Sequence, residues 1–147
     1  MNREKLYEEI KADEGEVLEV YLDHLGLPTI GIGHLVTQQD EEFGKPPGTV
    51  ITAERSRELF ARDIDNAIED CKRLFPQWHN WPEEVQLIMV NMCFNLGATR
   101  LAHFVQMRVE LAQKNWKQAA VEGRDSKWYR QVTNRAERLM TRLENVE

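Results

Sequence analysis

The spacing of hydrophobic and polar residues divides the chain into a short segment with strand-like pattern and a longer helical segment. Glycine and proline are concentrated before residue 51, whereas hydrophobic residues recur at helical spacing after residue 52. Near the start, Leu6, Tyr7, Ile10 and Glu14 fall on one helical stripe, and Gly15 follows as a helix terminator. This pattern predicts an N-terminal helix over residues 3–14.

Two strands and a turn are expected next. Val17–Asp23 and Thr29–Leu35 have strand-like composition and flank the turn residues 24–28. A polar loop with prolines follows at Gln38–Gly48. Together these segments predict a small lobe with a β-hairpin over residues 15–51.

The remaining pattern is helical. Thr52 can cap a long helix over residues 52–75, which Pro76 ends. A second helix begins at Pro82. It is hydrophobic nearly all round from Val85 to Leu96 and is therefore expected to be buried. Further helices are expected at 101–114, 116–122, 126–130 and 134–143, with Asn115 and Thr133 as caps.

The predicted fold is α+β but mainly α, with a helical lobe formed by residues 76–147 and the N-terminal helix. A cleft between two such lobes is a natural ligand site.

Composition narrows the function. With 147 residues, 41% hydrophobic, the chain fits one domain with a real core. A net charge of −6 argues against nucleic-acid binding, and no hydrophobic run is long enough to span a membrane. The first residues lack the hydrophobic core of an export signal. The histidines show no metal-site spacing, and Cys71 and Cys93 are expected to be core thiols.

The candidate catalytic residues lie within the first 34 residues of the chain. Glu14 lies at the end of its helix on the apolar stripe, where partial burial and the helix dipole both favour a protonated acid. The alternative for Glu14 is an ordinary solvated residue at the helix end. Asp23 stands nine residues later, and its alternative is an ordinary structural role in the turn. Strand alternation puts Thr29, Gly31 and Gly33 on one face, which leaves a bare floor where a ligand can approach. Two carboxyl groups, a hydroxyl and a bare floor suggest a glycoside-hydrolase site.

The chain also resembles a known family. The resemblance is carried by Asp13-Glu14-Gly15, Tyr21, Asp23, Thr29–Leu35, Asn91–Gly97, Ala119–Val121, Trp128-Tyr129 and Thr133–Ala136, and it spans nearly the whole chain. In this order these motifs are similar to those of the T-even phage lysozymes, the muramidase endolysins of glycoside hydrolase family 24. The resemblance implies a single, two-lobed lysozyme-like domain that needs no cofactor or metal. It also implies hydrolysis, with inversion, of the β-1,4 bond between N-acetylmuramic acid and N-acetylglucosamine in peptidoglycan.

Residue roles follow from the same resemblance. Glu14 is expected to be the general acid, and Asp23 with Thr29 is expected to hold or activate the attacking water. Arg135 is expected to pair with Glu14, and His34 to make a structural hydrogen bond in the small lobe. Asn91 and Asn95 share a face of the buried helix and need hydrogen-bond partners. Expected substrate contacts are Leu35, Phe94, Asn95, Met107, Glu122 and Thr133.

Some features depart from the family pattern. A serine is more usual at Met107 and an asparagine at Glu122, and the loop Gln38–Gly48 is short enough that a small-lobe helix is expected to be missing. The acidic net charge also contrasts with a basic T-even enzyme, unless cations gather at the site. Candidates for such a patch, with an exposed helical face as the alternative, are Arg124, Lys127, Arg130, Arg135, Arg138 and Arg142.

These features predict a monomeric bacteriolytic endolysin whose partner is bacterial peptidoglycan, without nucleic acid or stable membrane association. It is expected in the host cytoplasm before lysis, reaching the cell wall once another protein has breached the membrane. Two alternatives stay open: a lytic transglycosylase, which forms an anhydro product, and a catalytically dead peptidoglycan-binding protein.

Overall fold

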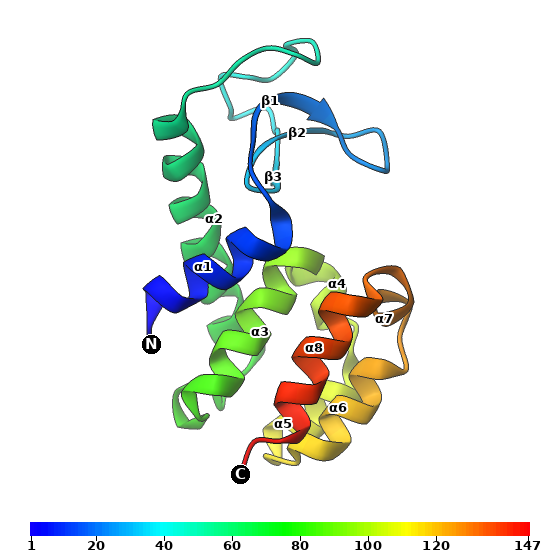
Figure 1. Ribbon diagram of the computed structural model, residues 1–147. Coiled ribbons are helices and arrows are strands. Elements are labelled where there is room, and N and C mark those ends of the chain that lie inside the picture. Colours follow the sequence, from blue (N-terminus) through cyan, green and yellow to red (C-terminus); the bar gives the residue numbers. More distant parts are fainter. The chain divides into compact units, whose positions relative to one another are not determined.

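A computed structural model describes residues 1–147, and the fold is α+β but mainly α, as predicted (Figure 1). Contacts divide the chain into two compact units, which we call the N-terminal unit (residues 7–65) and the C-terminal unit (residues 1–6 and 66–147). None of the helices is both long and apolar enough to cross a membrane. The helices are α1 (Arg3–Glu14), α2 (Ala53–Leu74), α3 (Glu83–Leu96), α4 (Ala98–Ala102), α5 (Val105–Ala112), α6 (Trp116–Arg124), α7 (Lys127–Gln131) and α8 (Thr133–Glu144), with a 3₁₀ turn at Trp78–Asn80.

The N-terminal unit contains one antiparallel sheet of three strands. Strand β1 (Val17–Leu22) pairs with β2 (Pro28–Gly31), which pairs with β3 (His34–Leu35). One face of the sheet packs on α2 through buried apolar side chains, namely Val20, Ile30, Val36, Ile51 and Leu59. Between Leu35 and Ala53 the chain forms turns and an isolated bridge to β1, with no helix, as the short loop predicts.

The prediction of a continuous strand from Thr29 to Leu35 is wrong. Gly31 and Gly33 have φ of +60° and +65°, a left-handed backbone that turns the chain between β2 and β3. Because the strand breaks there, the two glycines do not form a floor in line with Thr29. Ile30 and Ile32, the other two residues of this segment, are buried.

The C-terminal unit is a helical bundle around α3. Eight residues of α3 between Val85 and Cys93 are buried, which confirms the prediction of a central helix. Helix α6 packs between α5 and α8, and α8 also packs on α3 (Figure 1). Cys71 and Cys93 are free and buried, as predicted.

Helix ends follow the sequence in most places. The predicted caps are present at Thr52, whose Oγ1 accepts from the Arg55 amide at 3.0 Å, and at Asn115, which accepts from the Gln118 amide. The prediction fails at Thr133, because this residue starts α8 itself and its hydroxyl donates back to the Tyr129 carbonyl at 2.8 Å. The helix expected over 101–114 is also interrupted, at His103 and Phe104.

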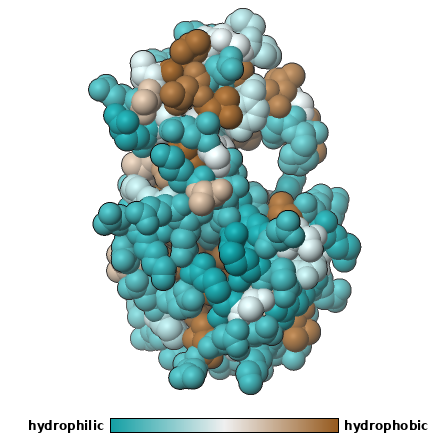
Figure 2. Space-filling model, in the orientation of Figure 1, coloured by the Kyte–Doolittle hydropathy of each residue, from teal (hydrophilic) through white to brown (hydrophobic).

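Hydrophobic side chains also reach the surface of the N-terminal unit, where Figure 2 shows several brown patches. The strands, the turn and the following loop contribute exposed Val17, Leu18, Leu22, Leu25, Leu27, Leu35, Phe43 and Val50. Leu35, an expected substrate contact, is 47% exposed and available to a ligand.

Candidate active site

Glu14 is the last residue of α1, and its carboxyl group packs directly on the backbone of Gly33. A Cβ atom at Gly33 would lie 2.9 Å from Oε1 and 3.1 Å from Cδ of Glu14. The helix ends here because Gly15, at φ +73°, donates its amide to the Lys11 carbonyl at 2.8 Å. The space expected to receive a ligand over Gly33 is therefore occupied by the Glu14 carboxyl group itself.

Asp23 holds the turn between β1 and β2. Its Oδ1 accepts hydrogen bonds from the amides of Leu25 at 2.8 Å and Leu27 at 2.9 Å. The Leu27 hydrogen bond, joined by that of Leu25 and the nearby His24, outweighs burial and lowers the pKa of Asp23. Asp23 is therefore an ionised carboxylate at neutral pH, and its second oxygen, Oδ2, has no hydrogen-bond partner in the protein.

Thr29 lies beside this turn and is only 5% exposed. Its hydroxyl donates to the Leu27 carbonyl at 3.0 Å, and the Leu27 amide in turn donates to Asp23. The Leu27 residue thus connects the two side chains. Asp23 and Thr29, which are expected to hold the attacking water together, are thus linked through one backbone residue.

The charges of both candidate carboxyl groups act on Tyr21. Burial raises the pKa of Tyr21 first, and the charges of Glu14 and Asp23 raise it further. Tyr21 pairs with Thr29 in the β1–β2 register. Tyr21 is therefore the backbone partner of Thr29 and a group on which the charges of Glu14 and Asp23 act.

His34 has the structural role that was favoured for it. Its Nδ1 lies 2.6 Å from Oδ2 of Asp63 on α2, and its Nε2 lies 2.8 Å from Oδ2 of Asp40. Burial lowers the pKa of His34, but the hydrogen bonds and charges of the two aspartates outweigh it, so the pKa is raised. Asp40 is itself bound by the Thr37 amide at 2.8 Å. The imidazole therefore ties the loop to α2, and the two aspartates favour its charged form.

Arg55 strengthens the same connection. Its guanidinium binds Glu42 through two hydrogen bonds, of 2.9 and 3.1 Å. Glu42 is only 4% exposed, and this contact lowers its pKa. Two ionic contacts thus hold the loop after β3 against the helix.

The other expected contact residues belong to the C-terminal unit. Asn91 is fully buried and accepts from Arg135 Nε at 2.9 Å, and half-buried Asn95 accepts from Trp128 Nε1 at 2.8 Å. Both asparagines therefore have the partners that their burial requires. Phe94 is half-buried and Thr133 exposed. The pairing of Glu14 with Arg135 stays a prediction.

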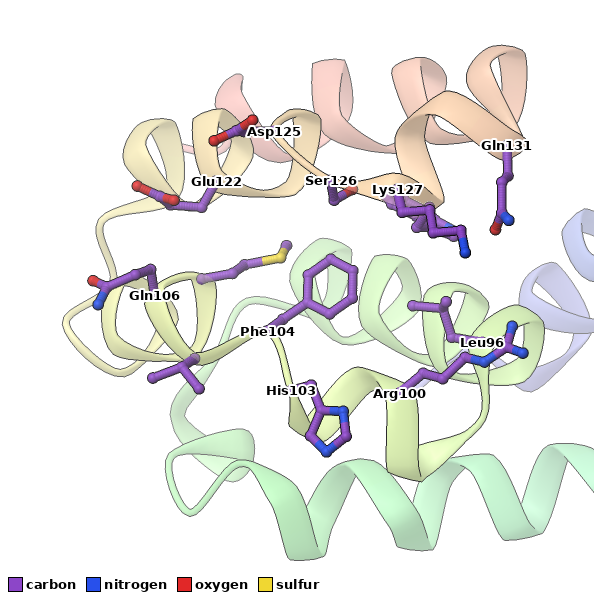
Figure 3. Close-up of a pocket in the computed structure, with 13 residues that line it drawn as sticks. Leu96, Arg100, His103, Phe104, Gln106, Glu122, Asp125, Ser126, Lys127 and Gln131 are labelled. Atoms are coloured by element: carbon purple, nitrogen blue, oxygen red, sulfur yellow. The ribbon is translucent and has the colours of Figure 1, made fainter.

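Met107 and Glu122 line a cavity of about 510 Å³ within the C-terminal unit (Figure 3). Met107 is 1% exposed, so only a small part of its side chain reaches the cavity. Glu122 is half-buried and accepts from Gln118 Nε2 at 3.2 Å. Phe94, Asn95 and Thr133 are not part of the lining.

Charge is divided unevenly along the chain. Residues 7–65 carry 14 Asp and Glu against 5 Lys and Arg, a net charge of −9, which leaves +3 for the remaining residues. The expected cationic patch is smaller than the sequence suggests, because Arg124 binds Glu137 and Glu144 and Arg142 binds Glu84. No group of three or more His, Cys, Asp or Glu residues is arranged to hold a metal ion.

Comparison with known proteins gives a consistent result. The model of a family described as phage lysozyme matches residues 11–145. The chain is 31% identical over 154 residues to probable T4-type lysozyme 2 of Dictyostelium discoideum, covering 92% of this chain and 91% of that protein. It is 34% identical over 114 residues to the endolysin of Salmonella phage P22, covering 76% and 73% of the two chains.

A longer relative is also similar. The pre-baseplate central spike protein Gp5 of Enterobacteria phage T4 is 34% identical over 151 residues, which is 90% of this chain. The chain spans only 26% of that protein's length.

Proposed function

Because the chain belongs to the phage lysozyme family, we propose that it hydrolyses the β-1,4 bond between N-acetylmuramic acid and N-acetylglucosamine in bacterial peptidoglycan. The family assigns it to the glycosidases. Among its relatives are an endolysin and a protein named peptidoglycan hydrolase gp36, of Pseudomonas phage phiKMV, which support this substrate. As an endolysin it acts on the cell wall as a monomer, without a cofactor, once the host membrane has been breached.

Glu14 is the general acid in this proposal. Its protonated carboxyl group gives a proton to the glycosidic oxygen as the bond from that oxygen to the anomeric carbon breaks. The contact with Gly33 supports the role, since a side chain at position 33 would push the carboxyl group away. The carboxyl group therefore lies against the turn between β2 and β3.

Asp23 and Thr29 position the attacking water. The water oxygen bonds to the anomeric carbon and its proton passes to the Asp23 carboxylate. Two amide hydrogen bonds to Oδ1 keep Asp23 ionised and leave Oδ2 open for the water. Thr29 lies one residue from this turn and contributes its hydroxyl oxygen.

The observation that carries the proposal is the contrast between the surroundings of two carboxyl groups in the N-terminal unit. Glu14 packs against bare backbone at Gly33, and Asp23 is bound by two amides. A pair of this kind is what acid–base cleavage of a glycoside requires. Leu35, Phe94, Asn95, Met107, Glu122 and Thr133 remain the proposed substrate contacts.

The test is release of reducing ends from purified peptidoglycan. Borohydride reduction of the fragments, followed by mass spectrometry, identifies which sugar carries the new end. We expect wild type to release ends carried by N-acetylmuramic acid, and Glu14→Gln to lose this activity while keeping its circular dichroism spectrum and Tm. Glu8→Gln is the matched control, because it removes one exposed carboxylate from the same helix.

Other outcomes contradict the proposal in distinct ways. Anhydro-muramyl products would show a lytic transglycosylase, which does not need Asp23 to hold water. Binding to insoluble peptidoglycan without release of sugar would show a binding protein. An active Glu14→Gln variant would remove the general-acid role.

A further inference from the structure

Ser56 is a buried polar residue that the proposed reaction does not use. It lies on the buried face of α2, one turn before Leu59 and Phe60, and none of its surface is exposed. A hydroxyl group in such surroundings costs free energy unless it has a hydrogen-bond partner. Within a helix, the partner that a serine reaches most easily is the carbonyl four residues earlier, which here is that of Thr52.

The Ser56 hydroxyl reaches a different partner. It donates to Oε2 of Glu16 at 2.7 Å, a residue 40 positions away in the sequence. The other oxygen of this carboxyl group, Oε1, lies 3.9 Å from Nζ of Lys11 on α1, and the Glu16 side chain is only 26% exposed. A short hydrogen bond to a carboxylate is among the strong ones. Glu16 therefore connects the end of α1 to α2.

The same hydroxyl also lies against the turn that supports Glu14. A Cβ atom at Gly31 would lie 2.9 Å from Ser56 Oγ. Gly31 begins the turn that continues to Gly33, and the Glu14 carboxyl group packs on Gly33. Ser56 thus contacts two segments that determine where Glu14 lies. One is the chain two residues after Glu14, and the other is the turn on which its carboxyl group rests.

We propose that Ser56 and Glu16 form a positioning pair for the general acid. Their hydrogen bond holds the residue before β1 and the turn after β2 to the same point on α2, and so keeps the Glu14 carboxyl group at its place against Gly33. Neither residue of the pair contacts the substrate or exchanges a proton with it. The inference rests on the proposed function, which gives Glu14 its role, and adds two residues that act through Glu14.

Three variants test the hydrogen bond on soluble peptidoglycan fragments. Ser56→Ala and Glu16→Ala should each lower kcat about tenfold with KM unchanged, since a displacement of about 1 Å at a reacting group can cost about 100-fold. Glu16→Gln should keep the kcat of wild type, because its amide oxygen accepts the same hydrogen bond.

Thr52→Ala is the matched control for a loss of stability alone. Thr52 lies one turn before Ser56, and its Oγ1 accepts from the Arg55 amide at 3.0 Å. Its replacement removes a hydroxyl hydrogen bond from the same end of α2 and should lower Tm to a similar extent as Ser56→Ala. The kcat of Thr52→Ala should equal that of wild type, because this hydroxyl contacts neither Glu16 nor Gly31.

The double variant Ser56→Ala/Glu16→Ala distinguishes a pair from two independent effects. If the two residues act through their shared hydrogen bond, the double variant should lose no more kcat than either single variant. Losses that multiply to about 100-fold would overturn the inference. Glu16→Gln as slow as Glu16→Ala, or Thr52→Ala as slow as Ser56→Ala, would overturn it as well.

Proton NMR measures the position of Glu14 without the reaction. Glu14 Cγ lies 3.5 Å from the place that a Cβ atom on Gly33 would take, so wild type should show a nuclear Overhauser effect between the γ protons of Glu14 and the α protons of Gly33. This signal should weaken in Ser56→Ala and Glu16→Ala and stay unchanged in Thr52→Ala. An unchanged signal in Ser56→Ala would overturn the inference.

Failure of the positioning pair and failure of the proposed function are distinguishable. Release of reducing ends by wild type, with equal kcat in Ser56→Ala and Thr52→Ala, overturns the positioning pair and leaves the proposed function intact. No release by wild type, with the NMR signal weakened only in Ser56→Ala and Glu16→Ala, supports the positioning of Glu14 and overturns the proposed function.

Discussion

Replacing Gly33 with alanine tests whether the absence of a side chain at this position lets the Glu14 carboxyl group lie where catalysis requires it. The added Cβ would lie 2.9 Å from Oε1, whereas ordinary contacts begin near 3.4 Å, so the carboxyl group must retreat by about 0.5 Å. A misplacement of 1 Å at a reacting group can cost about 100-fold in rate. We therefore expect Gly33→Ala to lower kcat about tenfold.

Backbone strain must be separated from this effect. Alanine at φ +65° costs about 1–2 kcal/mol of folding stability wherever it is placed. Gly44→Ala is the matched control, because Gly44 has φ +82° and no atom within 4 Å of the added Cβ. Both variants should lose similar Tm, but only Gly33→Ala should lose activity.

The assay is kcat and KM on soluble peptidoglycan fragments, measured at a temperature where both variants are fully folded. A Gly33→Ala enzyme with the kcat of Gly44→Ala would refute the reasoning. So would an equal loss in both variants, since that would trace the effect to strain alone.

Two further predictions concern stability. His34→Asn removes the cation between Asp40 and Asp63 and should cost about 3 kcal/mol, as breaking a largely buried ion pair does. Because the pKa of His34 is raised and that of Asp40 is lowered, the loss of stability should be largest between about pH 4 and 6.5. It should shrink as the pH rises through the His34 pKa or falls through the Asp40 pKa. Urea denaturation at several pH values measures this dependence. Gly123→Ala places a Cβ against the Met140 sulfur and should lower the free energy of unfolding by about 1–3 kcal/mol in the same assay. An unchanged free energy of unfolding would show that Met140 moves aside freely.

Much of the fold could be predicted because helical periodicity extends over many residues. The all-round hydrophobic pattern of α3 predicted its burial, and the cap at Thr52 predicted the start of α2. The sequence does not predict the break in the strand after Gly31. Hydrophobic alternation indicates a strand there, whereas the glycines indicate a turn within the same six residues. Thr133 was misassigned because its hydroxyl can either cap a helix or bond back to a preceding carbonyl.

Parts of the site could not be predicted from the sequence. Glu14 and Asp23 were found by local position and resemblance, but the contact of Glu14 with Gly33 depends on how the chain turns. The partners of His34, Asp40 and Asp63, are 6 and 29 residues away, and no short motif connects them. Tyr21 stands in the sequence only as part of a motif, because its pairing with Thr29 depends on the strand register.

The central claim is that Glu14 and Asp23 carry out a single displacement by water. Proton NMR of the fragments during the first turnovers reads the configuration of the new reducing end before mutarotation. The account predicts the α anomer, formed by inversion of the β-linked bond. The β anomer would instead show retention through a covalent intermediate, and would contradict the assignment of Asp23 as the residue that positions water.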